Sequence, residues 1–293
     1  RLDWLRTQRE RIDDGRWLRA SGPKGEAGTL DSVWMELNYN VSLLYLIEGK
    51  EGEYFRLEVD ENGVVKKPEA ESGEGEAASS GDILHAEYYT ADEMNAVERH
   101  IERHFGKFDN VFHELISPDI HVDICVVAPT PERDYYSLVT MGMGAHRMNV
   151  PGELAEYKLE RAELAIALPS DWKVSPEAFE DEKNYWPVRL LKSLARLPID
   201  ADTWLGWGHT TDNQVPYAEN TDLCAAMLVG SQMGEESGVC TLPNGEEVNF
   251  YQVIPLYRDE MEYKLETDSN ELLAKMEDVS FVVDINRRSV MAD

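Results

Sequence analysis

A stretch almost without apolar side chains divides this chain of 293 residues into two unequal parts. Residues 61–82 are mainly charged or small, and they lead into the run Glu71-Ser-Gly-Glu-Gly-Glu-Ala-Ala-Ser-Ser80. Such a segment cannot bury enough apolar surface to offset the entropy that ordering it would cost. We therefore expect a small α+β unit over 1–60, an acidic flexible linker over 61–82 and a main domain over 83–293.

The small unit combines one helical pattern with strand patterns. Apolar residues between Leu2 and Leu18 recur at a spacing that indicates an amphipathic helix. Two apolar runs, Val33–Ile47 and Tyr54–Val59, predict strands joined by a turn at Gly49–Gly52. This unit matches no pattern that indicates a function.

The main domain begins with one helix and later contains another. Thr90 and Glu93 form a capping box, and Gly106 marks the end of the apolar periodicity that follows. A second helix is expected to begin at Trp186-Pro187, where a first turn tolerates proline, and to end before Pro198.

A series of apolar runs bounded by Pro, Gly or Asp predicts the strands of the main domain. They are Val111–Ile116, Ile120–Val127, Tyr135–Met143, Leu159–Leu168, Leu223–Val229, Val239–Leu242, Val248–Leu256 and Phe281–Ile285. Asn244-Gly245 predicts a hairpin turn, and consecutive strands predict an antiparallel meander.

Two short helical patterns, Arg258–Glu266 and Ser269–Met276, precede the last of these strands. Strands therefore occur in blocks with helices inserted, without a regular βαβ alternation. The predicted fold class is α+β, a mixed and largely antiparallel sheet with flanking helices, plus the small N-terminal α+β unit.

The charge of the chain limits its partners. It carries 28 Lys and Arg against 57 Asp and Glu, a net charge of −29 with His neutral. Such a field repels phosphate backbones and anionic lipids, so we expect neither a nucleic acid nor a membrane as partner. A basic protein partner is favoured, although simple solubility in an acidic proteome explains the charge equally well. The longest apolar run, Val41–Ile47, is too short to span a bilayer.

The cysteines and the missing nucleotide motifs argue against cofactor chemistry. Cys125, Cys224 and Cys240 have no CxxC or metal-knuckle spacing, so we expect reduced thiols and a cytoplasmic protein. The sequence contains no Walker loop, no GxGxxG and no GxSxG. We expect no cofactor and no enzymatic activity.

Histidines give the main alternative to this expectation. His121 and Asp123 alternate on a predicted strand, so both side chains emerge on one face. With His113 or Glu114 as a third ligand they would form the site of a metal-dependent hydrolase. A structural hydrogen bond is the simpler interpretation of this pair.

A second histidine pair, His100 and His104, has a spacing that can bind zinc. Glu102 lies roughly 200° around the helix from His100, so it cannot act as a base beside such a metal. We interpret the pair as the flank of a half-buried helix.

The segment Trp204–Asp212 concentrates two indoles, two glycines and a histidine. Exposed tryptophans are typical of binding hot spots, and glycines beside aromatic residues mark close backbone approach. A glycine-rich turn capped by core tryptophans is the alternative interpretation.

Several ordered blocks make the chain, from about residue 85 to its end, similar to the suppressor-of-fused family, especially its bacterial members. The blocks are Ile120-His-Val-Asp-Ile-Cys-Val-Val-Ala-Pro-Thr130, Tyr136-Ser-Leu-Val-Thr-Met-Gly-Met-Gly144, Glu163-Leu-Ala-Ile-Ala-Leu-Pro-Ser-Asp-Trp172, Trp186-Pro-Val-Arg-Leu-Leu-Lys-Ser-Leu-Ala-Arg196, Gly206-Trp-Gly-His-Thr210 and Val248-Asn-Phe-Tyr-Gln-Val-Ile-Pro-Leu-Tyr257.

The resemblance implies a mixed sheet with flanking helices and a protein-binding function. Eukaryotic relatives bind Gli-type transcription factors by adding a peptide strand to a sheet, and bacterial relatives resemble immunity proteins or antitoxins that neutralise toxins, many of them nucleases. An acidic inhibitor would suit the basic surface of a nuclease. The tyrosine that contacts the peptide in eukaryotic relatives is replaced here by Leu138.

We therefore predict an immunity protein or antitoxin that binds a basic toxin stoichiometrically. Its expected contact residues lie on the strand Leu138–Met143 and around the tryptophan-rich loop. They are Leu138, Thr140, Met141, Met143, Trp207, His209, Asp212 and Tyr217. The alternatives are a regulator that sequesters a transcription factor or another protein by β-augmentation, the metal-dependent hydrolase, and a scaffold that recruits proteins through the acidic linker.

Overall fold

The chain forms two units in a computed structural model, and each unit is described by itself. The structure describes residues 30–36, 42–47, 54–58, 87–108, 110–114 and 119–292. The first unit contains a three-stranded antiparallel sheet of β1 (Leu30–Glu36), β2 (Ser42–Ile47) and β3 (Tyr54–Glu58), in that order. The run expected as one strand, Val33–Ile47, is thus divided between β1 and β2. The expected helix Leu2–Leu18, the turn Gly49–Gly52 and the linker 61–82 lie outside the described residues.

The second unit is built on an eight-stranded sheet in the order β4-β5-β6-β7-β11-β9-β8, and β10 pairs with β11 outside this path. The strands are β4 (Asn110–Phe112), β5 (Asp123–Val127), β6 (Tyr135–Met141), β7 (Ala162–Pro169), β8 (Thr210–Asp212), β9 (Ala225–Gly230), β10 (Val239–Thr241) and β11 (Glu247–Leu256). The helices are α2 (Ala91–His104), α3 (Glu182–Asp200), α4 (Arg258–Glu266) and α5 (Ser269–Lys275), with 3₁₀ turns at Met143–Ala145, Gly152–Tyr157, Ala178–Glu180 and Glu235–Gly238.

The sheet confirms the predicted class and its meander. Strands β4 to β7 follow one another with antiparallel neighbours, whereas β7 and β11 run parallel. The fold is therefore α+β with a mixed, largely antiparallel sheet and flanking helices, as predicted. The hairpin turn at Asn244-Gly245 is also confirmed, because it joins β10 to its antiparallel partner β11 and Gly245 has a positive φ of 85°.

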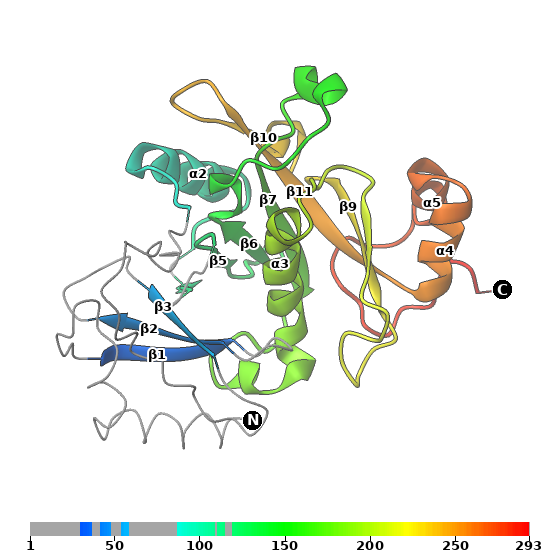
Figure 1. Ribbon diagram of the computed structural model, residues 1–293. Helices are drawn as coiled ribbons and strands as arrows, with labels where there is room; N and C mark the ends of the chain where they lie inside the picture. Colours follow the sequence, from blue (N-terminus) through cyan, green and yellow to red (C-terminus); the bar gives the residue numbers. More distant parts are fainter. Residues whose placement is uncertain are drawn as a thin grey trace. The chain divides into compact units, whose positions relative to one another are not determined.

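Helices cover both faces of the sheet (Figure 1). In β5, Ile124 and Val126 belong to the core that includes α3, whereas Cys125 and Val127 belong to the core that includes α2. A third cluster joins β9 and the end of β11 to α4 and α5. Because alternate residues of a strand point to opposite faces, burial on both faces requires the continuous apolar runs seen in the sequence.

Helix α2 has the boundaries that its capping residues predict. The Thr90 hydroxyl accepts a hydrogen bond from Glu93 N (3.3 Å), and the Glu93 carboxylate accepts one from Thr90 N (2.9 Å). Gly106 follows the helix with a φ of 121°, and its N–H donates to Ile101 O (3.1 Å). The helix therefore ends as expected, at a residue whose backbone conformation only glycine adopts without strain.

Helix α3 is longer than predicted, because both prolines lie inside it. It begins after Asp181, whose carboxylate accepts a hydrogen bond from Lys183 N (3.0 Å), and it continues through Pro187 and Pro198. An interior proline costs about 3 kcal/mol. Burial of one Leu side chain contributes ~1.5–3 kcal/mol, and α3 buries several leucines in the main core. Packing therefore outweighs the lost backbone hydrogen bonds.

The prediction of a last strand over Phe281–Ile285 is wrong. This segment forms only one isolated parallel bridge, between Val282 and Ala167, with a hydrogen bond from Val283 N to Ala167 O (2.9 Å). Strand β7 ends at Pro169, which has no N–H to continue a ladder. The first strand of the main domain is also shorter than expected, since β4 stops at Phe112.

A buried carboxylate holds the turn after β6. Glu163 is fully buried in β7 and accepts hydrogen bonds from the hydroxyls of Thr140 (2.5 Å) and Tyr89 (2.7 Å). It also accepts them from the N–H groups of Gly142 (2.8 Å) and Gly144 (3.1 Å). Burial raises the pKa of Glu163, and the four donors oppose this shift only in part. The segment Met141–Gly144 is thus a structural turn.

Gly142→Ala is expected to destabilise the second unit by more than about 3 kcal/mol. Gly142 has a φ of 129°, and an added Cβ would lie 1.8 Å from the backbone oxygen of His121. Urea unfolding followed by tryptophan fluorescence measures the change. The matched control is Gly152→Ala, where no atom lies within 4 Å of the added Cβ. We expect that control to change stability by less than ~0.5 kcal/mol, and similar losses in both variants would contradict the account.

Candidate binding surfaces

The loop between α3 and β8 presents one tryptophan to solvent and packs the other. The Trp207 side chain is 48% exposed, whereas Trp204 packs against the main core. A side chain at Gly206 would meet the Trp204 ring at 2.5 Å, and Gly208 has a φ of 78°. The Ser269 hydroxyl of α5 donates a hydrogen bond to Gly208 O (3.2 Å). Trp204 therefore fits the interpretation as a packed core residue, whereas Trp207 is exposed on a fixed backbone and its part in binding stays a prediction.

His209 and Asp212 attach the same loop to its surroundings. The His209 ring lies edge-on to Trp204 at 4.2 Å, and burial lowers its pKa, with the nearby Lys264 charge acting in the same direction. Asp212, at the exposed end of β8, pairs with Arg258 (2.6 Å), the first residue of α4. The loop is thus connected to α4 as well as to α5.

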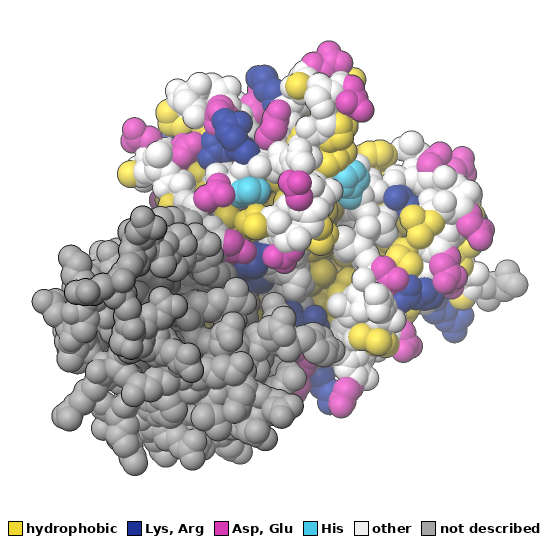
Figure 2. Space-filling view, viewed as in Figure 1, with side chains coloured by type: hydrophobic (Ala, Val, Ile, Leu, Met, Phe, Trp, Pro, Cys, Tyr) yellow, Lys and Arg dark blue, Asp and Glu magenta, His cyan; other side chains and the backbone are white. Residues whose placement is uncertain are grey.

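Exposed acidic side chains on α4, on α5 and in the turns that follow them form an acidic face beside this loop. We use this name for the exposed side chains Asp259, Glu262, Glu266, Asp268, Glu271, Glu277 and Asp278. Leu265 lies among them and is 65% exposed. Figure 2 shows acidic side chains together with an apolar area over these helices. The predicted site residues did not include this face, although the sequence from 258 to 278 contains eight acidic residues against Arg258, Lys264 and Lys275.

The predicted contact strand Leu138–Met143 coincides largely with β6, which lies inside the sheet and is paired on both edges. Its residue Thr140 pairs with Ile124 of β5, and Leu138 pairs with Ile166 of β7. The four side chains proposed as contacts on this strand, Leu138, Thr140, Met141 and Met143, are all buried. A peptide cannot add to a strand that is paired on both sides, so these residues support the sheet in this structure.

Tyr217 is also buried. Its ring stacks on Trp186 at 5.0 Å with an interplanar angle of 8°. Burial raises the pKa of Tyr217 well above its ordinary value. Of the eight expected contact residues, Trp207 and Asp212 are exposed and His209 is partly exposed. The accessible part of the expected site is therefore the loop alone.

The structure brings the suspected metal ligands together as a hydrogen-bonded network. Asp123 lies 3.1 Å from Nε2 of His121 and 2.9 Å from Nδ1 of His113, and it accepts a hydrogen bond from Glu114 N (2.9 Å). The Glu114 carboxylate accepts hydrogen bonds from Val122 N (3.0 Å) and from Arg196 (2.7 Å).

The two imidazoles therefore contact the Asp123 carboxylate, whereas the Glu114 carboxylate is bound by Val122 N and Arg196. Burial raises the pKa of Asp123, but the hydrogen bonds from His121, Glu114 N and His113 hold it below its ordinary range. In the part of the chain that the structure describes, no three His, Cys, Asp or Glu residues are grouped to hold a metal ion. The geometry is that of a structural network, and it does not support the hydrolase alternative.

The other histidine pair is similarly engaged. Nε2 of His100 lies 3.1 Å from Ser237 O, and its ring packs 4.5 Å from that of His104 and 4.5 Å from that of Phe250. The three cysteines are free thiols and buried. Within the described ranges, no helix has the length and apolar character needed to cross a bilayer.

Comparisons with known proteins agree with this fold. The sequence profile of the Suppressor of fused protein family (SUFU) matches residues 118–288. An uncharacterized protein of Ureaplasma parvum serovar 3 is 30% identical over 206 residues, which is 69% of this chain and 96% of the relative. The chain therefore belongs to the suppressor of fused family.

Solved structures are similar to this chain at lower identity, and the first of them shows the same architecture. A putative SUFU homolog from Neisseria gonorrhoeae is 20% identical, with a TM-score of 0.50 over 70% of this chain and 100% of the homolog. The Sufu-Fu complex and Drosophila Suppressor of Fused are each 14% identical over 68% of this chain, with TM-scores of 0.49 and 0.48. The match covers 92% of the chain in the complex and 51% of the Drosophila protein.

We expect His121 to make stability depend on pH. Its hydrogen bond with Asp123 raises the pKa of His121 above the ordinary value of 6.5, despite the opposing effect of burial. A raised pKa in the folded state adds stability that is fully present below pH 6.5 and is lost as the pH rises through the folded-state pKa. His121→Asn should therefore lower the free energy of unfolding by ~1 kcal/mol more at pH 5.5 than at pH 8.5. Urea unfolding at both pH values tests this, and a loss independent of pH would contradict it.

Proposed function

We propose that this protein is a non-enzymatic protein-binding module that neutralises a basic toxin by stoichiometric binding, as an immunity protein or antitoxin. The observation that carries the proposal is the exposed Trp207 on a fixed loop beside the acidic face of α4 and α5. Tryptophan at the centre of an interface contributes more binding free energy than most residues. The surrounding carboxylates select a partner of positive charge.

Family membership and net charge support the same function. The resemblance to the suppressor of fused family implies that bacterial relatives are similar to immunity proteins or antitoxins, which neutralise toxins that include many nucleases. A nuclease needs a basic surface to bind the phosphate backbone of its nucleic-acid substrate. A chain with a net charge of −29 is attracted to such a surface and is repelled by the nucleic acid itself.

Two experiments test this function in sequence. The tagged protein is purified from its native host at low salt, and partners are identified by mass spectrometry with their stoichiometry. Each partner is then expressed alone and together with this protein. The proposal requires a one-to-one complex with a basic protein whose toxicity disappears on co-expression. Absence of a protein partner at low salt, or a partner without toxicity, overturns it.

Trp207→Ala is expected to weaken the complex at least tenfold, or about 1.4 kcal/mol. The cause is loss of the exposed indole from the interface, without loss of core packing. Calorimetric titration with the purified partner measures the change. Tyr157→Ala is the matched control, because Tyr157 is an aromatic residue that is 59% exposed outside the loop and the acidic face. Equal effects of the two substitutions would contradict the assignment of the surface.

The acidic face should make affinity depend on salt. Exposed charges are screened over ~8 Å at physiological ionic strength, so dissociation constants should rise as salt is added. The double substitution Glu262→Gln and Glu266→Gln should reduce the slope of this dependence, since it removes two exposed carboxylates from α4. The control Glu153→Gln and Glu156→Gln changes net charge equally on the 3₁₀ turn Gly152–Tyr157. If the salt dependence of affinity had the same slope in both double variants, the acidic face would not be the contact surface.

A further inference from the structure

The sheet of the second unit ends at β8, which is a short edge strand. It pairs with β9 on one side, and none of the described strands pairs with its other side. Thr210 and Thr211 are partly exposed, and Asp212 is exposed. A free edge presents N–H and C=O groups to solvent, and natural edges are often protected by Lys or Pro. Strand β8 contains neither, so its edge is open to pairing with another strand.

The alternation of hydrogen bonds shows which backbone groups face this edge. His209 and Asn213 form backbone hydrogen bonds toward β9 and the residue before it, both at 2.9 Å. Thr211 lies midway between them and continues the same antiparallel register. Alternate residues of such a ladder bond to the same neighbour. Thr210 and Asp212 therefore direct their N–H and C=O groups away from β9.

The segment around β8 is symmetric about Thr211. Gly208 and Gln214, three residues to either side, have positive φ values of 78° and 66° and end the extended backbone. Directly beyond them lie two exposed apolar side chains, Trp207 at 48% and Val215 at 61% exposure. An antiparallel copy of the same segment would therefore match each of these features with its counterpart.

We propose that β8 pairs with β8 of a second copy of this chain, antiparallel and with a two-fold axis at Thr211. Thr210 of one copy then lies opposite Asp212 of the second copy, and their outward groups form about four hydrogen bonds. The same register brings Trp207 of one copy to the end of the interface that holds Val215 of the second copy. The neighbouring registers would leave about half of the outward groups unpaired. Such an interface is isologous, as in most homodimers.

The charge at the edge favours a second copy over a basic peptide. Asp212 is the only charged residue of β8, and it pairs with Arg258 (2.6 Å). A basic peptide would therefore find no free carboxylate on the strand, whereas a second copy needs none. The net charge of −29 on each copy opposes association over longer distances. Added salt screens this repulsion, so the dimer should become tighter as salt rises.

The dimer goes beyond the proposed function and does not rest on it. Trp207 cannot contact a second copy and a toxin at the same time, so a toxin bound there would displace the second copy. The two associations depend on salt with opposite signs, because the toxin complex weakens as salt is added and the dimer tightens. A salt series therefore distinguishes them.

Cysteine cross-linking of the full-length chain tests the register. On the two-fold axis Thr211 faces its own copy in a non-hydrogen-bonded pair, with Cα atoms ~4.5 Å apart, a separation that a disulfide can bridge. Thr211→Cys should form a covalent dimer with oxidised glutathione on a non-reducing gel. Thr210→Cys is the matched control, because Thr210 faces Asp212 of the second copy. The wild-type cysteines are buried, so the wild-type chain should not cross-link. Equal cross-linking of the two variants, or none in Thr211→Cys, overturns the inference.

Sedimentation equilibrium at several protein and salt concentrations measures the dimer itself. Thr210→Pro removes an outward N–H at an edge position that tolerates proline, and it should weaken the dimer about tenfold. Val215→Ser should weaken it about fivefold by removing an apolar contact. Tyr157→Ala, an exposed aromatic residue outside β8, should leave it unchanged. If Thr210→Pro does not fold, Val215→Ser and the cysteine variants decide. A monomer under all conditions, a dimer that weakens with salt, or one that Val215→Ser leaves intact overturns the inference, whereas failure to find a toxin overturns only the proposed function.

Discussion

The carboxylate of Glu163 is the group on which the arrangement of the second unit depends most. It lies in β7, at the point where the antiparallel meander ends and the parallel pairing with β11 begins. Its four donors come from β6, from the turn after it and from Tyr89 before α2. A buried carboxylate is tolerated only when such hydrogen bonds replace its hydration. The sheet, the turn and the start of α2 are therefore joined through one side chain.

This anchor also explains why the segment Thr140–Met143 cannot serve as a contact surface. The Thr140 hydroxyl both donates to Glu163 and accepts a hydrogen bond from Leu164 N (2.8 Å). Arg161 adds to the same region, where it donates to Glu93 (2.7 Å) and to Glu246 (2.6 Å). Exposing this strand to a partner would leave several buried polar groups unpaired, at ~1–3 kcal/mol each. The strand is therefore not accessible to a partner in this structure.

Local sequence signals predicted most of the fold, because each acts over a few residues. The Thr90–Glu93 capping box, the glycine after α2 and the Asn244-Gly245 turn all lie where they were expected. The boundaries of α3 were not predictable from its prolines, since burial of its leucines in the tertiary core decides them. The parallel pairing of β7 with β11 likewise depends on residues far apart in the chain.

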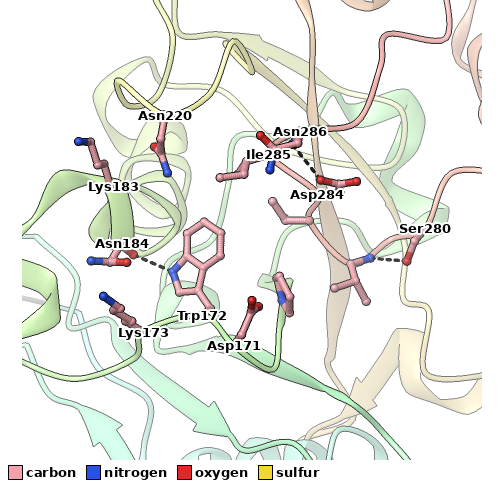
Figure 3. Close-up of a pocket in the computed structure, with 13 residues that line it drawn as sticks. Asp171, Trp172, Lys173, Lys183, Asn184, Asn220, Ser280, Asp284, Ile285 and Asn286 are labelled. Carbon is pink, nitrogen blue, oxygen red and sulfur yellow. Dashed lines mark hydrogen bonds between the residues drawn. The ribbon is translucent and has the colours of Figure 1, made fainter.

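The candidate sites were harder to predict for the same reason. The sequence indicated the tryptophan-rich loop, but only the tertiary structure distinguishes the packed Trp204 from the exposed Trp207. Acidic residues on α4 and α5 were visible in the sequence, yet their position beside the loop follows from the contact between Ser269 and Gly208. A pocket lined by Trp172, Asn220 and Asp284 likewise combines three distant segments, and no local pattern brings such residues together (Figure 3).

Under the proposed function, the acidic face and Trp207 have complementary physical roles in binding a basic partner. Long-range attraction to the negative charge of the chain accelerates encounter but distinguishes poorly among cationic proteins, because it depends on net charge more than on shape. Selectivity requires short-range contacts that a wrong partner leaves unsatisfied. Trp207 would supply such a contact, because it is a large exposed apolar side chain on a fixed loop. An acidic surface alone would attract many proteins, whereas a fixed apolar contact would distinguish among them.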